Sequence, residues 1–235
     1  MIGTMYIDGT PLKNYGAVLS NWNPGTPSIS NMITPGEDYS FPVLLHSEIT
    51  PKALTARVHI IGKNYAEASR KMSALILALN KTTDLQMPDG FYYRSVLTEV
   101  SDLEWTNRHI AEFTLAFQSV QHGPYISISP YTAGTPIYYS GTAPAGAKIE
   151  FDAPEDMQDM TVSIGTNEIQ LITIPSGAHI VLNGIEKIIT QNGENKFADT
   201  NLVDFPALEP SETAYAIQVS KPVSNLSVGY YPTYI

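Results

Sequence analysis

The stretch from residue 54 to residue 79, LTARVHIIGKNYAEASRKMSALILAL, contains two different hydrophobic periods. From Leu54 to Ile60 every second residue is apolar, which is the period of a strand with one buried face. Asn64 followed three residues later by Glu67 is a capping box, so we predict one amphipathic helix that starts there and ends near Lys81. Its apolar positions recur at helical spacing, at Ala68, Met72, Leu75, Ile76 and Leu79.

Strand signals surround this segment in the first half of the chain. Asp8-Gly9 predicts a tight hairpin turn, because these residues adopt positive φ angles readily. Alternating residues predict further strands from Tyr93 onward and from Phe113 to Phe117, whereas residues 22–38 are rich in Asn, Pro, Gly and Ser and predict a loop. One helix packed on a curved sheet or barrel is the simplest fold for this half.

The second half contains no helical period, and short alternating segments recur about every ten residues. This rhythm predicts an antiparallel β-sandwich. Asn183-Gly184 and Asn192-Gly193 both predict type I′ hairpin turns. The segments are Ile149/Phe151, Met160/Val162/Ile164, Ile169/Leu171, Ile180/Leu182, Tyr215/Ile217/Val219 and Leu226/Val228/Tyr230.

The chain of 235 residues is long enough for two small domains. Gly123-Pro124, followed by the Pro- and Gly-rich stretch 129–146, predicts a boundary near residue 124, with domains 1–124 and 125–235. Charge is divided unevenly, since residues 1–119 hold 9 basic and 11 acidic residues, a net of −2, and residues 120–235 hold 4 and 12, a net of −8. The second domain is thus predicted to be strongly acidic.

Composition excludes several classes of function. A net charge of −10 argues against a free-standing nucleic-acid-binding protein, because phosphate contacts need a basic face. The count of zero cysteines excludes disulfides, thiolate zinc sites and cysteine nucleophiles. Neither a signal peptide nor a long apolar run is present, so we expect a soluble product made in the cytoplasm, with no membrane insertion.

Motifs for catalysis or for phosphate binding are absent, and the five histidines (His46, His59, His109, His122 and His179) do not have the spacing of a metal site.

Two groups of acidic residues are candidate sites. Glu99, Asp102 and Glu104 precede Trp105 and could serve a glycosidase, although a charged turn is the simpler interpretation. Glu155, Asp156 and Asp159 could bind calcium, but they lack the order of a calcium loop. We therefore expect no catalytic, cofactor or metal residues.

A series of motifs in the second half resembles the distal tail protein (Dit) family of long-tailed phages and of tail-like particles of Gram-positive hosts. The series has a fixed order and ends at the C-terminus, and the strand–helix–strand order of the first half fits as well. It departs from the family pattern at Ser211-Glu212, where Gly and Asn are usual. The motifs are residues 140–145 (SGTAPA), 180–189 (IVLNGIEKII), 191–195 (QNGEN), 205–210 (FPALEP) and 230–234 (YYPTY).

This resemblance implies a non-enzymatic structural hub. A tail-tube-like N-terminal β-barrel or sandwich with one helix would close a homo-hexameric ring at the distal end of the virion tail. A galectin-like C-terminal β-sandwich would hold receptor-binding or side-fibre proteins. The expected partners are the tail tube protein and the tail-tip protein. One alternative is a carbohydrate-binding adhesion module, in which the C-terminal sandwich contacts cell-wall saccharides through exposed Tyr and Trp. The other is a wall-degrading glycosidase that uses Glu99 and Glu104.

Overall fold

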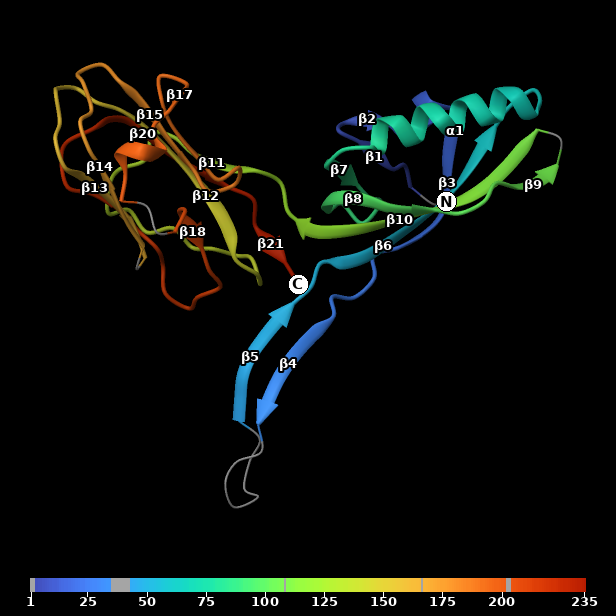
Figure 1. The fold of residues 1–235 in the computed structure, drawn as a ribbon, viewed down its shortest axis with the longest axis horizontal. Coiled ribbons are helices and arrows are strands. Elements are labelled where there is room, and N and C mark those ends of the chain that lie inside the picture. The colour runs from blue at the N-terminus through green and yellow to red at the C-terminus, as the bar shows by residue number, and fades with distance from the viewer. Residues whose placement is uncertain (1–2, 35–42, 108, 166, 202–203) are drawn as a thin grey trace. The chain divides into compact units, whose positions relative to one another are not determined.

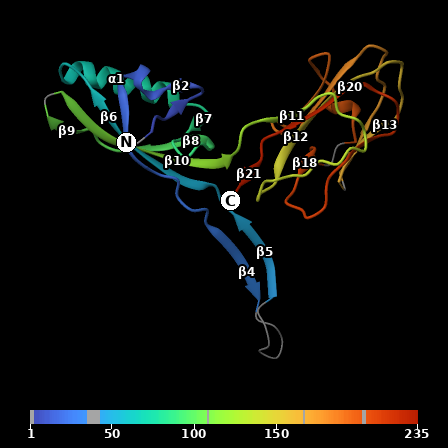
Figure 2. The same ribbon diagram turned by 180° about the vertical axis from the view of Figure 1, so that it is seen from behind.

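The computed structural model describes residues 3–34, 43–107, 109–165, 167–201 and 204–235 of the chain. The chain forms two compact units, Met1–His122 with Ile235 and Gly123–Tyr234, which are called unit 1 and unit 2 below. Strands predominate in both units, and the α-helix of the described residues belongs to unit 1 (Figures 1 and 2). The predicted fold class, mainly β with one helix, is confirmed.

Unit 1 is built on a curled antiparallel sheet with the strand order β2-β1-β7-β8-β10-β6-β3. The longest strand, β10, pairs with β6 on one side and with both β8 and β9 on the other. The strands are β1 (Tyr6–Ile7), β2 (Thr10–Pro11), β3 (Ala17–Asn23), β6 (Lys52–Ile61), β7 (Thr83–Gln86), β8 (Tyr92–Val100), β9 (Glu104–Asn107) and β10 (Ile110–His122), with a 3-10 turn at Leu12–Tyr15.

Buried and more exposed residues alternate along β10 and β6, and the buried ones form the core of unit 1. Phe113, Leu115 and Phe117 of β10 are buried, and the register places them opposite the buried residues 58, 56 and 54 of β6. The intervening residues of both strands point to the other face of the sheet. The predicted strands of residues 54–60 and 113–117 are thus confirmed. Both strands extend beyond the residues whose apolar alternation predicted them.

Helix α1 (Tyr65–Leu79) covers the core face of this sheet. Asn64 is its N-cap, since Asn64 Oδ1 accepts a hydrogen bond of 3.0 Å from the Glu67 backbone N–H. The reciprocal bond of the predicted capping box reaches one residue further back, because Glu67 Oε2 accepts from the Lys63 N–H instead. Three of the five predicted apolar positions, Ala68, Leu75 and Leu79, are buried.

The loop predicted for residues 22–38 is wrong over most of its described length. β3 continues to Asn23, and β4 (Ile29–Thr34) pairs antiparallel with β5 (Val43–Ile49) in a two-stranded ribbon. Residues 29–32 of β4, Ile29 and Met32 among them, are all exposed, so this described part of the ribbon has no hydrophobic alternation to detect. Residues 35–38 of the predicted loop lie outside the described residues.

Unit 2 consists of antiparallel strands around a single core, as a β-sandwich requires. One sheet has the order β11-β20-β12-β15-β16-β17, with β18 beside β12, and the other has the order β14-β13-β19. The strands are β11 (Ile126–Ile128), β12 (Ala145–Asp152), β13 (Met160–Ile164), β14 (Asn167–Leu171), β15 (His179–Asn183), β16 (Ile188–Gln191), β17 (Glu194–Asn195), β18 (Ala207–Leu208), β19 (Ile217–Val219), β20 (Ser224–Tyr230) and β21 (Thr233–Tyr234), with a 3-10 turn at Phe197–Asp199.

Two of the three predicted tight hairpin turns are confirmed by pairs of positive φ angles. Asp8 and Gly9 have φ of 47° and 77°, and Asn192 and Gly193 have 51° and 83°. The turn predicted at Asn183-Gly184 is wrong, because β15 ends at Asn183 and four residues separate it from β16. The Asn183 side chain organises this longer loop by accepting the backbone N–H groups of the second and third loop residues at 3.0 and 3.1 Å.

Gly184 has a packing role instead of a turn role. Its N–H donates to the Ala147 carbonyl at 2.9 Å, and the Ala147 N–H donates to the Pro206 carbonyl at 2.8 Å. A Cβ added at Gly184 would lie only 2.0 Å from the Pro206 carbonyl oxygen, and one added at Gly146 only 2.3 Å from the Gly184 carbonyl oxygen. Residues from the motif segments 180–189 and 205–210 therefore meet beside β12 through backbone-to-backbone contact.

Gly184→Ala should therefore destabilise the protein by about 3 kcal/mol, because backbone atoms must move to admit the methyl group. Gly193→Ala is the matched control. Its added Cβ meets nothing within 4 Å, so only its φ of +83° is penalised, at about 1 kcal/mol. Urea unfolding of both variants measures the difference, and equal losses of stability would contradict the close-packing argument.

Candidate assembly surface

One face of the unit 1 sheet is covered by α1, and the described residues of unit 1 leave the opposite face uncovered. On this uncovered face four large apolar side chains are between 42% and 50% exposed. They come from four different strands, so they are not explained by one irregular element. They are Val18 of β3, Ile61 of β6, Val96 of β8 and Val120 of β10.

The centre of the uncovered face is polar and charged. Glu112 of β10 contacts two residues of β6, with Arg57 Nη1 3.3 Å from Glu112 Oε1 and His59 Nε2 against Glu112 Oε2. Arg57 and Glu112 carry opposite charges across the strand pair, and all three residues remain partly exposed. Such exposed pairs add little to stability, so this centre is a water-compatible surface and not a second core.

The sheet also has a long open edge. β3 pairs with β6, and no other described strand pairs with its outer side. Near its end, the Asn21 side chain accepts the Trp22 N–H at 2.8 Å, which occupies one of the strand's backbone donors. On the far side the sheet ends at β9 and at the two-residue strand β2, which contains Pro11. An unpaired edge of this kind is a template for pairing with another chain.

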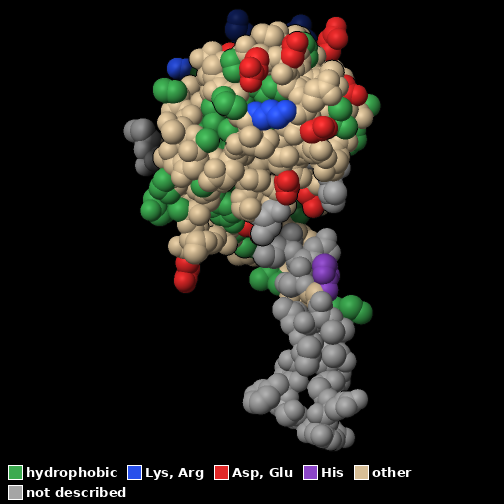
Figure 3. All heavy atoms as spheres, turned by 90° about the vertical axis from the view of Figure 1, so that its left-hand side faces the viewer, with side chains coloured by type: hydrophobic (Ala, Val, Ile, Leu, Met, Phe, Trp, Pro, Cys, Tyr) green, Lys and Arg blue, Asp and Glu red, His purple; other side chains and the backbone are tan. Residues whose placement is uncertain are grey.

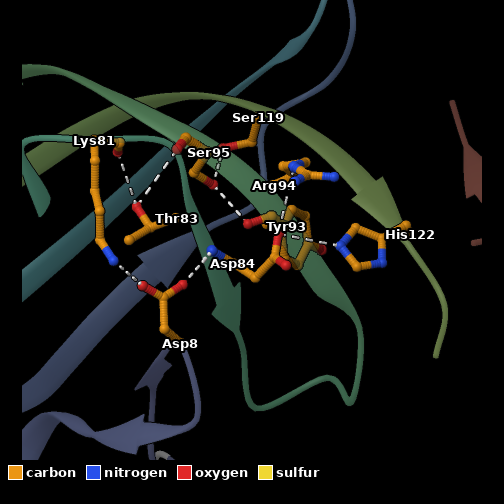
Figure 4. Close-up of polar contacts among 9 residues, drawn as sticks. All are labelled: Asp8, Lys81, Thr83, Asp84, Tyr93, Arg94, Ser95, Ser119 and His122. Atoms are coloured by element: carbon orange, nitrogen blue, oxygen red, sulfur yellow. Dashed lines mark hydrogen bonds and ion pairs between the residues drawn. The ribbon is translucent and has the colours of Figure 1, made fainter. Parts of the chain in front are cut away.

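A cluster of polar side chains lies at one end of the same sheet (Figure 4). Asp84 of β7 lies 3.6 Å from Nε2 of the buried His122 and 4.0 Å from Arg94 Nε. Its backbone N–H donates to Asp8 Oδ1 at 2.9 Å, and Asp8 Oδ2 in turn pairs with Lys81 Nζ at 2.8 Å. The cluster thus ties the β1–β2 turn, β7, β8 and the end of β10 together.

The charges in this cluster favour the ionised form of the Asp84 carboxyl group. The neighbouring His122 lowers the pKa of Asp84, against an opposing contribution from partial burial and with a smaller one from Arg94. Behind the cluster, the buried hydroxyl groups of Ser95 and Ser119 are 2.7 Å apart. Burial raises the pKa of Tyr93, whose hydroxyl donates to Asp89 Oδ2 at 2.7 Å. These contacts hold strands in register, and none presents an exposed nucleophile.

The acidic residues of the two candidate sites are exposed on strands and turns. Glu99 lies in β8, Asp102 in the β8–β9 turn and Glu104 in β9, and all three are exposed. Glu155, Asp156 and Asp159 lie in the turn between β12 and β13, where Asp156 Oδ1 accepts the Ser176 N–H. Among the described residues, no group of three or more His, Cys, Asp or Glu side chains could hold a metal ion.

The histidines lie apart, each in its own environment. His59 contacts Glu112, and His109 Nδ1 lies 3.3 Å from the Gly62 carbonyl oxygen. His179 Nδ1 is 2.7 Å from Asp152 Oδ1. Asn225 donates to the other Asp152 oxygen at 2.7 Å, and these two bonds, Asn225 first, lower the pKa of Asp152. Asp152, His179 and Asn225 thus connect the ends of β12, β15 and β20. They are not part of any described cluster that could hold a metal ion.

Unit 2 has an acidic surface with isolated exposed aromatic side chains. Carboxylate groups are dispersed over the face seen in Figure 3 and do not gather into one patch. The chain has three adjacent tyrosine pairs, Tyr92-Tyr93 in unit 1 and Tyr138-Tyr139 and Tyr230-Tyr231 in unit 2. Tyr93, Tyr139 and Tyr230 are buried, and Tyr138 is 76% exposed. The remaining members are half-buried, and they contact the rings of His122 and Tyr125, respectively.

No described helix is long and apolar enough to cross a membrane. No family model matches the sequence, and no curated protein does either. Solved structures do match over nearly the full length. The Dit protein of phage SPP1, described as a paradigm of the hub adsorption apparatus in phages that infect Gram-positive bacteria, aligns with a TM-score of 0.73 and 13% identity, covering 99% of both chains.

Two structures of the phage P2 baseplate in its activated conformation align as well. The form with Ca has a TM-score of 0.59 and covers 98% of both chains, and the form with Sr has a TM-score of 0.58 and covers 97%. Both are 13% identical in sequence. The chain therefore has the fold of these phage hub and baseplate proteins, and the resemblance indicated by the motifs is confirmed at the level of the fold.

The Asp84 cluster gives a pH-dependent prediction. Because the pKa of Asp84 is lowered in the folded state, its contribution is present above its unfolded value of 3.8 and is lost as the pH falls through the lower folded value. Asp84→Asn should cost about 1 kcal/mol at about pH 5, a figure already reduced for solvent screening, and almost nothing at about pH 2.

Asp8→Asn is the control for this prediction. Asn can keep both the positive φ of the turn and the bond from the Asp84 N–H, while the exposed pair with Lys81 is lost. Denaturant unfolding of both variants at the two pH values measures the effect. A loss in Asp84→Asn that does not change with pH would show that the charge of Asp84 is not what matters.

Proposed function

We propose that this chain is a structural, non-enzymatic hub protein of a phage tail or tail-like particle. It forms a homo-hexameric ring at the distal end of the tail tube, between the tube and the tail-tip and receptor-binding proteins. The observation that carries this proposal is the fold match to the SPP1 Dit protein over 99% of both chains. Copies are made in the bacterial cytoplasm and reside in the assembled virion tail.

The open edge of β3 supports ring formation by unit 1. A closed ring uses head-to-tail contacts, in which one surface of a copy meets a different surface of the next. Unit 1 has two different edges, β3 on one side of the sheet and β9 with β2 on the other. Pairing between copies would satisfy the free backbone groups of β3 and would cover the half-exposed Val18 beside them.

The uncovered face supports a channel role. When six curled sheets join edge to edge, one face of each sheet turns toward the axis of the ring. The face opposite α1 is suited to this position, because Arg57 at its centre is paired with the oppositely charged Glu112. A surface without a strong positive charge does not hold DNA that passes along it.

Charge supports an outward position for unit 2. The two halves of the chain have net charges of −2 and −8. Six copies of the acidic half repel one another, so the arrangement that separates them most is favoured. The galectin-like sandwich would then be free to hold receptor-binding or side-fibre proteins. Sugar binding by unit 2 has less support, because both tryptophans lie in unit 1.

Light scattering and negative-stain images of the purified chain test the ring. We expect a six-fold particle of about 154 kDa, which is six times 25.7 kDa, with a central hole. Val18→Asp should reduce the mass to that of a monomer, because it places a charge at the edge where copies meet while leaving a half-exposed site folded.

Leu77→Asp is the matched control for Val18→Asp. Leu77 is 75% exposed on α1, on the other side of the sheet, so a charge there should leave the ring intact. Loss of the ring in both variants, or in neither, would contradict closure through the edge of β3.

A further inference from the structure

A pocket of about 440 Å³ opens on unit 1 and is lined by Lys63, Asn64, Tyr65 and Trp105. It lies where the start of α1 meets β9, on the side of the sheet that the helix covers. Its volume falls in the range of about 300–1,000 Å³ that is typical of small-ligand sites. Trp105 belongs to β9, one of the two edges assigned to the ring, whereas Asn64 and Tyr65 lie at the start of α1 and outside that edge.

Two aromatic rings form the apolar part of the pocket. The rings of Tyr65 and Trp105 have centroids 5.4 Å apart and planes at 34°, so they make a bent, continuous platform. Tyr65 is 66% exposed although its ring is large and mostly apolar. An exposed aromatic platform of this kind suits a partner with one apolar face and many polar groups.

The polar groups of the pocket are mostly donors. The lining residues carry the Lys63 ammonium, the Asn64 amide, the Trp105 indole N–H and the Tyr65 hydroxyl, and none of the four carries a carboxylate. The nearby Glu67 is engaged elsewhere, since its two oxygens accept from Lys71 Nζ at 2.8 Å and from the Lys63 backbone N–H at 3.0 Å.

The pocket is held in shape before any ligand arrives. Asn64 caps α1 through its side-chain oxygen, which fixes the orientation of its amide nitrogen. β9 is paired with β10, where Trp105 lies opposite Ala111. Prior ordering of this kind lowers the entropic cost of binding.

We infer that this pocket binds a saccharide that carries an anionic group. The C–H face of a sugar ring stacks on the Tyr65–Trp105 platform, its hydroxyl oxygens accept from the surrounding donors, and a carboxylate or phosphate substituent pairs with Lys63. The pocket is open and its volume of about 440 Å³ is that of a small-ligand site, which favours a saccharide over a protein partner. The inference does not depend on the ring.

Isothermal titration calorimetry of the full chain with trigalacturonate and with maltotriose tests this inference. We expect trigalacturonate to bind with a Kd in the millimolar range or tighter, and maltotriose to bind more weakly. Tyr65→Ala and Trp105→Ala should each weaken trigalacturonate binding about tenfold through lost stacking. Lys63→Gln should weaken trigalacturonate alone and remove its advantage over maltotriose.

Tyr138→Ala is the matched control, since Tyr138 is a similarly exposed tyrosine, at 76% against 66% for Tyr65, in unit 2 and outside the pocket. It should leave binding unchanged. Tyr65 is exposed, so its variant reports on the pocket even where Trp105→Ala fails to fold. The inference is overturned if neither saccharide binds, if Tyr65→Ala retains full binding, or if the pocket variants lose a protein partner while saccharides never bind.

Discussion

The open edge of β3 is the constraint on which the account of unit 1 depends. A sheet that is not closed leaves backbone donors and acceptors along its outer strand, and natural proteins cover, shorten or pair such edges. Here β2 is shortened to two residues and contains a proline, while β3 is seven residues long and has no described partner on its outer side. The same sheet leaves one face uncovered. If copies join edge to edge, the β3 edge is paired and the uncovered face turns toward the ring axis, which is why the edge links the fold to the proposed ring.

Unit 2 depends on a different constraint, the close approach of backbones around Gly184, Gly146 and Pro206. The sequence allowed the strands of this unit to be predicted, because each has a buried face with a period of two. It did not allow the role of Gly184 to be predicted, because Asn-Gly has the same signature in a tight turn as in a loop where glycine is needed for space. The β4–β5 ribbon was missed for a related reason. The ribbon residues whose burial is described, 29–32 and His46, are all exposed, so no hydrophobic period marks them.

The candidate surface was predictable only in part. Ile61 and Val96 could be identified as apolar residues on the second faces of strands, and His59 as a residue facing away from the core. Their position on one uncovered face could not be predicted, because it depends on the register between β6, β10 and β8. The Tyr65–Trp105 pocket joins residues 40 positions apart, and no local pattern connects them. The cluster around Asp84 likewise requires strand pairing to bring Asp8, Asp84 and His122 together.

Hydrogen exchange of the β3 backbone amides tests the central claim most directly. In the Val18→Asp monomer, the amides of Ala17–Asn23 that do not bond to β6 should exchange rapidly. In the assembled ring of the unmodified chain, the account predicts that these same amides are protected, because the neighbouring copy pairs with them. Equal, rapid exchange of these amides in a ring that has formed would contradict closure through this edge.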